Sequence, residues 1–257
     1  MNYTNKEMQV VMIARQIRDG QRVIVGTGLP LVGASLAKRT YAPGCCLLVE
    51  SGMVDGSPLE APTSVADLRF SHGASTLGET FRYFGLQNNT LRKQSLDLGF
   101  LGGAQIDPYG NLNSTSIGDY HRPTARFSGS GGANGIATYV NTVLMMQHQK
   151  RRFVERVDYL TSPGWIDGPE GRAKKGLPPD RGPVAVITDL GLMRFDEETK
   201  RMYVAEYFPG VTAEQIAENT GFPIDVSRAV EARPPEAESL AILREQIDPQ
   251  RMYIGRA

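Results

Sequence analysis

The chain has 257 residues, enough for one large domain or two small ones with a substantial core. Its 28 Lys and Arg balance its 28 Asp and Glu, and this net charge of zero argues against a sequence-independent nucleic-acid binder and against a surface-bound membrane protein. Cys45 and Cys46 are adjacent, which excludes a disulfide framework and favours a reducing compartment. Because the three histidines and two cysteines lack metal-ligand spacing, we expect no metal site.

The first twenty residues predict no signal sequence, because charged side chains from Lys6 to Asp19 interrupt any apolar core. The longest stretch without Lys, Arg, Asp or Glu, residues 127–149, contains glycines and many polar side chains, so its burial in lipid would be costly. The sequence therefore predicts a cytoplasmic protein with no membrane partner.

Helical and strand patterns alternate in the first fifty residues. Thr4 and Glu7 have the spacing of a capping box, and we expect Gly20 to end the helical pattern that follows. Pro30 is placed to begin a second helix, which runs to Arg39. The predicted strands, which are apolar or alternating runs, are 23–25, 46–49, 99–104, 143–146, 184–188 and 201–208. This alternation predicts an α/β fold.

The second half of the chain adds shorter elements. A charged turn at 196–200 joins the last two predicted strands. Thr212 and Gln215 cap a short helix, and 236–247 has the pattern of an amphipathic helix. Residues 168–183, rich in glycine, proline and basic side chains, are predicted to form a loop. Residues 71–89 contain no motif that we can assign.

The region 23–39 nearly matches a dinucleotide-binding fingerprint, with Glu50 as its acidic residue. The third glycine of that fingerprint falls on Leu31, however, and a predicted helix precedes the first strand. A non-catalytic dinucleotide-binding module is therefore a distant alternative. Gly26 and Gly28 are explained better as residues that permit a tight turn between strand and helix.

Glu50 ends an apolar strand and is followed by Ser51 and Gly52, which have little bulk to shield a carboxylate. Ligands of open α/β sheets bind in the crevice outside the carboxyl ends of the strands, where Glu50 is expected to lie. A solvent-facing or helix-capping carboxylate is the ordinary alternative for a single glutamate.

A glycine-rich segment, 129–135, lies within the charge-free region. Such a loop can direct successive backbone N–H groups at an anion or a developing oxyanion. A phosphate-binding loop is the competing interpretation, but the Gly-Lys-Ser/Thr ending is absent. A carboxylate at a strand end together with an amide-rich loop suits acyl transfer better than phosphoryl transfer.

Several motifs resemble those of the class I coenzyme A-transferase family, and of its B-type subunits in particular. Val49-Glu50-Ser51-Gly52 resembles the catalytic glutamate turn of the family. The other matching stretches are 3–8, 26–30, 102–113, 116–120, 129–134, 161–168 and 218–222. The resemblance covers nearly the whole chain.

The resemblance implies an open, mostly parallel sheet flanked by helices, in a single domain over 1–257. It also implies a ping-pong transfer of coenzyme A from an acyl-CoA such as acetyl-CoA to a short dicarboxylic acid such as glutaconate or 2-hydroxyglutarate. Glu50 would be the catalytic residue, passing through a mixed anhydride to a glutamyl-CoA thioester. The residues that the resemblance implies for binding the CoA thioester are Asn113, Gly131, Gly132 and Ala133.

The resemblance further implies that coenzyme A is a co-substrate and that no cofactor is permanently bound. An A subunit would complete the enzyme, in an A4B4 assembly. Two alternatives remain. One is a hydrolase or decarboxylase on the same fold, and the other is a scaffold subunit whose partner carries the catalytic residues.

Other candidate residues carry less weight. The three histidines (His72, His121 and His148) are assigned no catalytic role, and Asp107 is interpreted as a turn residue. Basic residues of the 168–183 loop could reach the CoA phosphates, although an ordinary solvated loop is the simpler interpretation. These residues are Arg172, Lys174, Lys175 and Arg181. Cys45 and Cys46 are expected to be inert packing residues.

Overall fold

The computed structural model describes residues 2–64, 67–78 and 96–255. The chain divides into two compact units, one formed by 1–100 with 234–257 and the other by 101–233. The single-domain expectation over 1–257 stays a prediction. Part of the 71–89 stretch, in which no motif could be assigned, lies outside the described residues.

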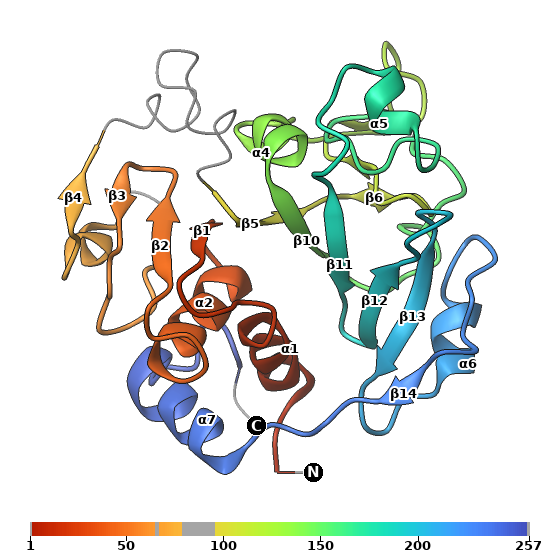
Figure 1. The fold of residues 1–257 in the computed structure, drawn as a ribbon. Helices are drawn as coiled ribbons and strands as arrows, with labels where there is room; N and C mark the ends of the chain where they lie inside the picture. The colour runs from red at the N-terminus through yellow and green to blue at the C-terminus, as the bar shows by residue number, and fades with distance from the viewer. Residues whose placement is uncertain (1, 65–66, 79–95, 256–257) are drawn as a thin grey trace. The chain divides into compact units, whose positions relative to one another are not determined.

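The first unit contains a sheet with the strand order β5-β1-β2-β3-β4 (Figure 1). Its strands are β1 (Arg22–Val25), β2 (Cys46–Val49), β3 (Met53–Val54), β4 (Thr76–Leu77) and β5 (Leu98–Gly102). β1 pairs in parallel with both β2 and β5, whereas β2, β3 and β4 are joined by antiparallel pairs. The carboxyl ends of β1 and β2 therefore lie at the same edge of the sheet.

Helices α1 (Asn5–Ala14) and α2 (Leu29–Arg39) pack against each other in this unit. The predicted capping box is confirmed, since Thr4 and Glu7 exchange their side-chain and backbone hydrogen bonds at the start of α1. The helix ends at Ala14 and not near Gly20, because the chain leaves it through tighter turns. A Cβ atom added to Gly33 would lie 2.4 Å from Cγ2 of Ile13, so only glycine permits this approach of α2 to α1.

Residues 234–257 return to the first unit as α7 (Ala237–Ile242) and a π-helical turn, η2 (Leu243–Ile247). Arg244 donates two hydrogen bonds to the completely buried Glu7 carboxylate, at 2.6 and 2.9 Å. Burial alone would raise the pKa of Glu7, but hydrogen bonds from Arg244 and Thr4 outweigh it and lower the pKa. This ion pair joins α1 to residues more than two hundred positions away.

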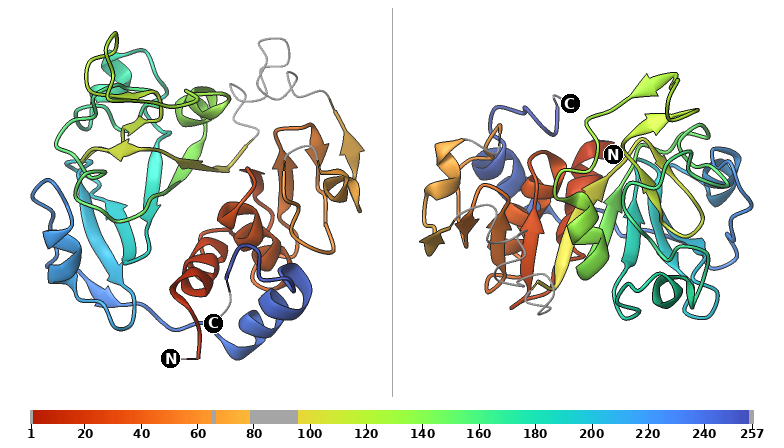
Figure 2. Two further views of the ribbon diagram at one scale, coloured as in Figure 1. Left: turned by 180° about the vertical axis from the view of Figure 1, so that it is seen from behind. Right: turned by 90° about the horizontal axis from the view of Figure 1, so that it is seen from above.

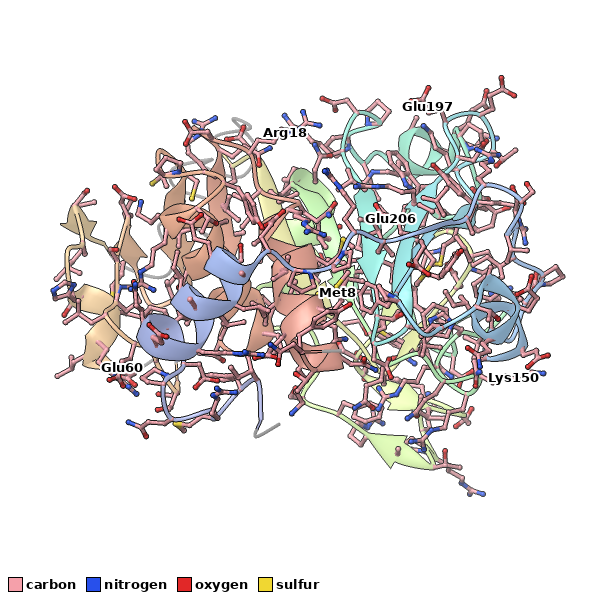
Figure 3. All side chains as sticks on the ribbon, turned by 90° about the horizontal axis from the view of Figure 1, so that it is seen from below. Met8, Arg18, Glu60, Lys150, Glu197 and Glu206 are labelled. Carbon is pink, nitrogen blue, oxygen red and sulfur yellow. The ribbon has the colours of Figure 1, made fainter. Side chains whose placement is uncertain are left out.

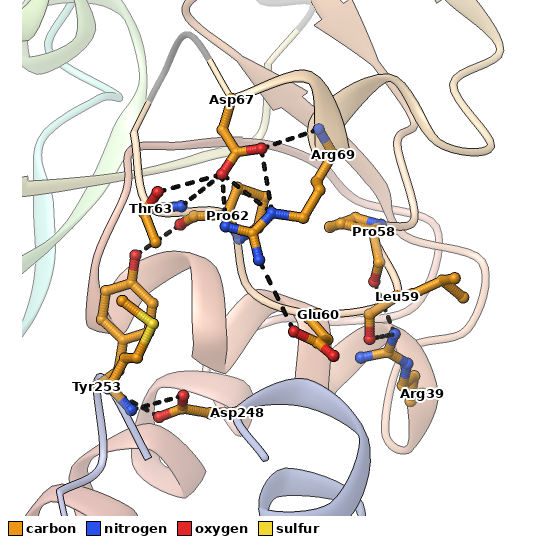
Figure 4. A network of polar contacts seen from close by, with 11 residues as sticks. Arg39, Pro58, Leu59, Glu60, Pro62, Thr63, Asp67, Arg69, Asp248 and Tyr253 are labelled. Carbon is orange, nitrogen blue, oxygen red and sulfur yellow. Dashed lines mark hydrogen bonds and ion pairs between the residues drawn. The ribbon is translucent and has the colours of Figure 1, made fainter. Parts of the chain in front are cut away.

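A second contact of the C-terminal segment is with the loop that contains the 3-10 helix η1 (Leu68–Ser71) (Figure 4). The Tyr253 hydroxyl donates to the carbonyl of Pro62 at 2.6 Å. In the same loop Arg69 pairs with Asp67 at 2.6 Å and with Glu60 at 3.8 Å. The hydrogen bonds from Arg69 hold the pKa of Asp67 well below its usual range.

The second unit contains strands in the order β10-β11-β12-β13-β14, which lie side by side in Figure 2. They are β10 (Asn141–Met145), β11 (Pro183–Ile187), β12 (Gly191–Phe195), β13 (Met202–Tyr207) and β14 (Val230–Glu231). β10–β11 and β13–β14 are parallel pairs, and β11–β12–β13 is an antiparallel meander. Two small hairpins complete the strands, β6 (Gln105–Ile106) with β7 (Leu112–Asn113) and β8 (Ser116–Ile117) with β9 (Ala125–Arg126).

Three short helices belong to the second unit: α4 (Ala133–Tyr139), α5 (Gly171–Lys174) and α6 (Ala213–Glu218). The predicted cap of α6 is confirmed, because Thr212 and Gln215 form a capping box. The sequence did not predict α4 or β12. It also assigned the turn at 196–200 to the wrong pair of strands, since the turn joins β12 to β13.

The α/β fold class is confirmed, with parallel pairs next to helices in both units. Apolar side chains such as Met8, 1% exposed, fill the core, whereas the labelled charged residues Lys150 and Glu197 lie at the surface (Figure 3). Among the described residues, no helix combines the length and the apolar character needed to cross a membrane.

Candidate active site

Glu50 lies at the tip of the β2–β3 hairpin, directly after the last residue of β2. The turn is closed by a hydrogen bond of 2.9 Å from the Gly52 amide to the Val49 carbonyl. Gly52 has a φ of 101°, a conformation that side chains with a Cβ rarely adopt. The backbone of Glu50 is therefore held in a tight turn at the carboxyl end of a buried strand, as the sequence predicted.

The base of the same hairpin is fixed by an ion pair. Lys38 on α2 donates to the Asp55 carboxylate at 2.6 Å and to the Cys45 carbonyl at 2.7 Å. The Asp55 amide in turn donates to the Leu47 carbonyl at 2.6 Å. These contacts connect the helix to both strands that flank Glu50.

The turn at Gly26–Gly28 lies beside Glu50, which the sequence did not predict. Val25 and Val49 are register partners in the parallel β1–β2 pair, so Gly26 and Glu50 leave the same edge of the sheet on neighbouring strands, which are about 4.8 Å apart. Gly28 has a φ of 89° and precedes α2 without a side-chain cap. Within the described part of the chain, the amides of Thr27 and Gly28 have no hydrogen-bond partner.

The Glu50 side chain is exposed in this chain. The described residues of the chain therefore do not themselves desolvate the carboxylate, which a nucleophilic carboxylate requires. The Ser51 hydroxyl next to it is buried and has no hydrogen-bond partner among the described residues. The site in this chain thus presents an immobilised turn with an open carboxylate.

In the predicted glycine-rich segment 129–135, Gly131 and Gly132 have φ angles of opposite sign, as in an anion-binding nest. Gly131 has a φ of 51°, and Gly132 follows in the right-handed region with φ −75° and ψ −10°. Two residues of opposite hand direct their N–H groups to the same side of the chain. Among the described residues, the amides of Gly131 and Gly132 have no partner, whereas the Ala133 amide donates to the Ser130 carbonyl at 3.0 Å.

Glu50 belongs to the first unit, and the glycine turn belongs to the second. That Gly131, Gly132 and Ala133 act together with Glu50 therefore stays a prediction.

Asn113 is fully buried, and its side-chain amide is saturated by internal hydrogen bonds. Nδ2 donates to Oε1 of Gln105 at 2.8 Å and to the Ser116 carbonyl at 2.7 Å. Oδ1 accepts from the amides of Thr115 and Ser116, at 2.9 and 3.2 Å. This geometry favours a role in shaping the β6–β7 region, and a direct contact of Asn113 with CoA stays a prediction.

Asp107 begins a turn, as predicted. Its carboxylate accepts hydrogen bonds from the amides of Tyr109 and Asn111, both at 3.0 Å, and from the Asn111 side chain at 2.8 Å. Burial outweighs these bonds and raises the pKa of Asp107 to about 6. All of these contacts are local, which is consistent with a structural role.

His148 is buried between two threonine hydroxyl groups, Thr188 at 3.2 Å and Thr220 at 3.0 Å. Burial lowers the pKa of this imidazole to about 4, so it is neutral at physiological pH. Burial also raises the pKa of the Cys45 thiol to about 11, as expected for an inert cysteine.

Arg172 contradicts both interpretations of the 168–183 loop, because its side chain is 0% exposed. It is neither solvated nor able to reach a CoA phosphate. The sequence could not predict this, since a basic residue in a glycine- and proline-rich stretch is usually exposed. Lys174 and Lys175 on the same segment are exposed, and Lys174 pairs with Glu170 at 3.0 Å.

No cluster of three or more His, Cys, Asp or Glu side chains in the described ranges has the arrangement of a metal site. Within the first unit, the exposed Glu50 carboxylate lies beside the unpartnered Thr27 and Gly28 amides. This arrangement is suited to acyl chemistry, in which a carboxylate attacks and N–H groups stabilise the oxyanion.

Comparison with known proteins supports this chemistry. The chain is 59% identical over 254 residues to the B subunit of glutaconate CoA-transferase from Acidaminococcus fermentans, covering 98% of this chain and 96% of the relative. It is 40% identical over 246 residues to the B subunit of 3-oxoadipate CoA-transferase from Pseudomonas knackmussii, with coverages of 93% and 92%. The crystal structure of glutaconate coenzyme A-transferase from Acidaminococcus fermentans matches with a TM-score of 0.95 at 58% identity, over 100% of this chain and 99% of that one.

More distant relatives have other names: a cholesterol ring-cleaving hydrolase subunit of Rhodococcus jostii at 30% identity, and the decarboxylase AibA/AibB at 27%. The family model for coenzyme A transferase matches residues 6–219. The resemblance inferred from the motifs is thereby confirmed, and the chain belongs to the coenzyme A transferase family.

Proposed function

We propose that this chain is the B-type chain of a CoA-transferase that moves coenzyme A from an acyl-CoA, such as acetyl-CoA, to a short dicarboxylic acid, such as glutaconate or 2-hydroxyglutarate. The observation that carries the proposal is the position of Glu50. Its carboxylate is open to a ligand while its backbone is held in the tight β2–β3 turn, beside the Gly26–Gly28 turn.

The reaction begins with attack of a Glu50 carboxylate oxygen on the thioester carbonyl of the acyl-CoA. The tetrahedral oxyanion collapses, the C–S bond breaks, and CoA thiolate leaves a mixed anhydride on Glu50. The thiolate then attacks the glutamyl carbonyl and expels the first carboxylic acid as its anion. Glu50 is now a CoA thioester, and the second acid runs the same steps in reverse, so no ATP is needed.

In this mechanism backbone amides stabilise the oxyanions. Gly131 and Gly132 supply two N–H groups that have no partner among the described residues, and Ala133 follows them at the start of α4. We assign these three residues and Asn113 to the CoA and thioester site. The remote CoA arm supplies the binding energy that desolvates the Glu50 carboxylate.

Exposure of Glu50 supports a site that is completed by a partner chain. The two most similar relatives described above are B subunits of CoA-transferases. We therefore propose an A subunit as the partner, in an A4B4 assembly that binds acyl-CoA and dicarboxylate. The free thiols Cys45 and Cys46 are consistent with a reducing compartment, and we propose the cytoplasm.

The test is to purify this chain with its A subunit and incubate the complex with acetyl-CoA. Mass spectrometry of the Glu50 peptide should then detect covalently bound CoA, and a dicarboxylate panel should show which acid releases it. Hydrolysis of acetyl-CoA with no adduct and no transfer to any acid would contradict the proposal and favour a hydrolase.

The Glu50→Gln variant should lower the transfer rate by about 10³-fold or more, because an amide cannot form the anhydride. The matched control is Glu60→Gln, a surface carboxylate in the same unit that pairs weakly with Arg69. Both complexes should assemble like the wild type. Full transfer activity in the Glu50→Gln complex would show that the chain is only a scaffold.

A further inference from the structure

Arg172 is a buried arginine whose guanidinium is surrounded by backbone carbonyl groups. Its side chain is completely buried, and among the described residues no carboxylate forms an ion pair with it. Burial lowers the pKa of Arg172 to about 10, so the group remains charged at neutral pH. A buried cation is tolerated when its donors are satisfied, as they are here.

The acceptors come from three segments of the second unit. Nη1 and Nη2 donate to the Ala137 and Thr138 carbonyls at the end of α4, at 3.2 and 2.6 Å. Nη1 also donates to the Gly164 carbonyl at 2.9 Å, and Nε donates to that of Pro178 at 2.9 Å. An apolar side chain could fill the same volume but could not connect these carbonyls. The position therefore requires a planar fork of donors.

The segment that Arg172 fixes most firmly is α4, which directly follows the glycine turn. The helix has only 7 residues, about two turns, so its two ends move as one body. A cation at the carboxyl end also interacts favourably with the helix dipole. Fixing the Ala137 and Thr138 carbonyls thus fixes the direction in which Gly132 enters the helix.

The start of α4 is held separately. The Asn134 side chain donates to the Thr161 carbonyl at 2.9 Å, and Thr161 lies in the same segment as Gly164. Gly129 and Ser114 exchange two hydrogen bonds at 3.0 Å, through the Gly129 amide and the Ser114 hydroxyl. The turn is therefore anchored on both sides, whereas the Gly131 and Gly132 amides have no partner among the described residues and remain available to a ligand.

We propose that Arg172, together with Asn134, is a positioning residue for CoA transfer: the two side chains fix α4 and thereby the direction of the Gly131 and Gly132 amides, which the proposed function assigns to the oxyanion formed during attack on the thioester. This inference rests on the proposed function. It requires no contact between Arg172 and the substrate, and Arg172 acts only through the backbone that it holds. Preorganised donors of this kind act on the transition state more than on the bound substrate.

The test compares Arg172→Lys, Arg172→Met and the control Arg228→Lys in the complex with the A subunit. Arg228 is a half-exposed arginine of the same unit. We expect kcat to fall about 10- to 100-fold in Arg172→Lys, because a lysine cannot hold all the carbonyls, and further in Arg172→Met. The KM for acyl-CoA should change less than about threefold, and Arg228→Lys should behave like the wild type. An assembled Arg172→Lys complex with kcat within about twofold of the wild type would overturn the inference, even if its melting temperature falls.

Asn134→Ala keeps the test decisive if the Arg172 variants do not assemble. Asn134 is exposed and alanine favours helix, so this variant should fold and still lower kcat without changing KM. An unchanged kcat in Asn134→Ala would overturn the proposal in that case.

The wild-type complex separates the two hypotheses. If the wild-type complex forms no CoA adduct, the proposed function fails. If it transfers CoA while the variants keep full kcat, only the role of Arg172 and Asn134 fails.

Discussion

His148 should make the second unit less stable in acid. Its Nε2 faces the Thr220 hydroxyl, which itself donates to the Ile216 carbonyl at 2.8 Å, so Nε2 must carry the proton and donate to Thr220. The Thr188 hydroxyl lies 3.2 Å from Nδ1 and donates to the Gly191 carbonyl at 3.3 Å. The ring is also stacked on Phe153, with the centroids 4.2 Å apart. A second proton would place a positive charge on an imidazole that is buried away from water.

The size of the effect follows from the pKa difference between the two states. Burial lowers the pKa of His148 to about 4, against about 6.5 in an unfolded chain. Between these values the unfolded state binds the extra proton more tightly, so the stability present above about pH 6.5 is lost as the pH falls. From about pH 7.5 to about pH 5, the free energy of unfolding should decrease by about 2 kcal/mol on account of this group.

The assay is urea unfolding at a series of pH values, followed by the fluorescence of Trp165, the single tryptophan of the chain, which lies in the second unit. The wild type is compared with His148→Gln, which keeps polar groups at the site but does not titrate. Asp107, with its pKa raised to about 6, acts in the opposite direction, because its ionisation destabilises the fold as the pH rises from about 4 to about 6. It is present in both proteins, so the difference between them isolates His148.

The stability difference between the wild type and His148→Gln should shift by about 2 kcal/mol across this range. The exposed His121→Gln variant is the control and should follow the wild type. A wild-type minus His148→Gln difference that stays constant with pH would refute the reasoning that burial keeps His148 neutral.

Two further substitutions test the packing of the first unit by chemical denaturation. Arg244→Met should lower the free energy of unfolding by about 3 kcal/mol, because it leaves the buried Glu7 carboxylate without its main partner. The control Lys174→Met breaks an exposed ion pair and should lower the free energy of unfolding by less than about 1 kcal/mol. Equal losses in the two variants would contradict this reasoning. Gly33→Ala should cost about 1–3 kcal/mol because its Cβ would lie 2.4 Å from Ile13. A Gly33→Ala protein as stable as the wild type would show that α2 can move away from α1 without cost.

Helix starts and apolar strands could be predicted from the sequence because their signals are local. The capping boxes at Thr4 and Thr212 are defined by residues three positions apart, and both form in the structure. The strand 46–49 was predicted with the bounds of β2. In these segments the preference of the backbone agrees with the burial that the fold requires.

The elements that were missed depend on distant contacts. β12 contains a glycine and an arginine, and it pairs antiparallel with β11 and β13. A Cβ at Gly191 would lie 2.3 Å from the Glu206 carbonyl oxygen, so glycine is needed for β13 to pack closely against β12. This glycine therefore does not mark a turn. The helix α4 starts in a glycine-rich segment with low helix propensity. It is held by Arg172 from outside and by the hydrogen bond from its own Asn134 to the Thr161 carbonyl.

The sequence alone determined that an acidic residue follows a buried strand, that the chain also contains a glycine-rich segment, and that the motifs resemble those of CoA-transferases. The tertiary structure decided which groups surround that residue. Gly26 adjoins Glu50 through the parallel register of β1 and β2, and Arg172 is buried because carbonyl groups of three separate segments converge on it. Such neighbours cannot be obtained from spacing along the chain, because strand register and carbonyl convergence arise only when the whole chain is packed.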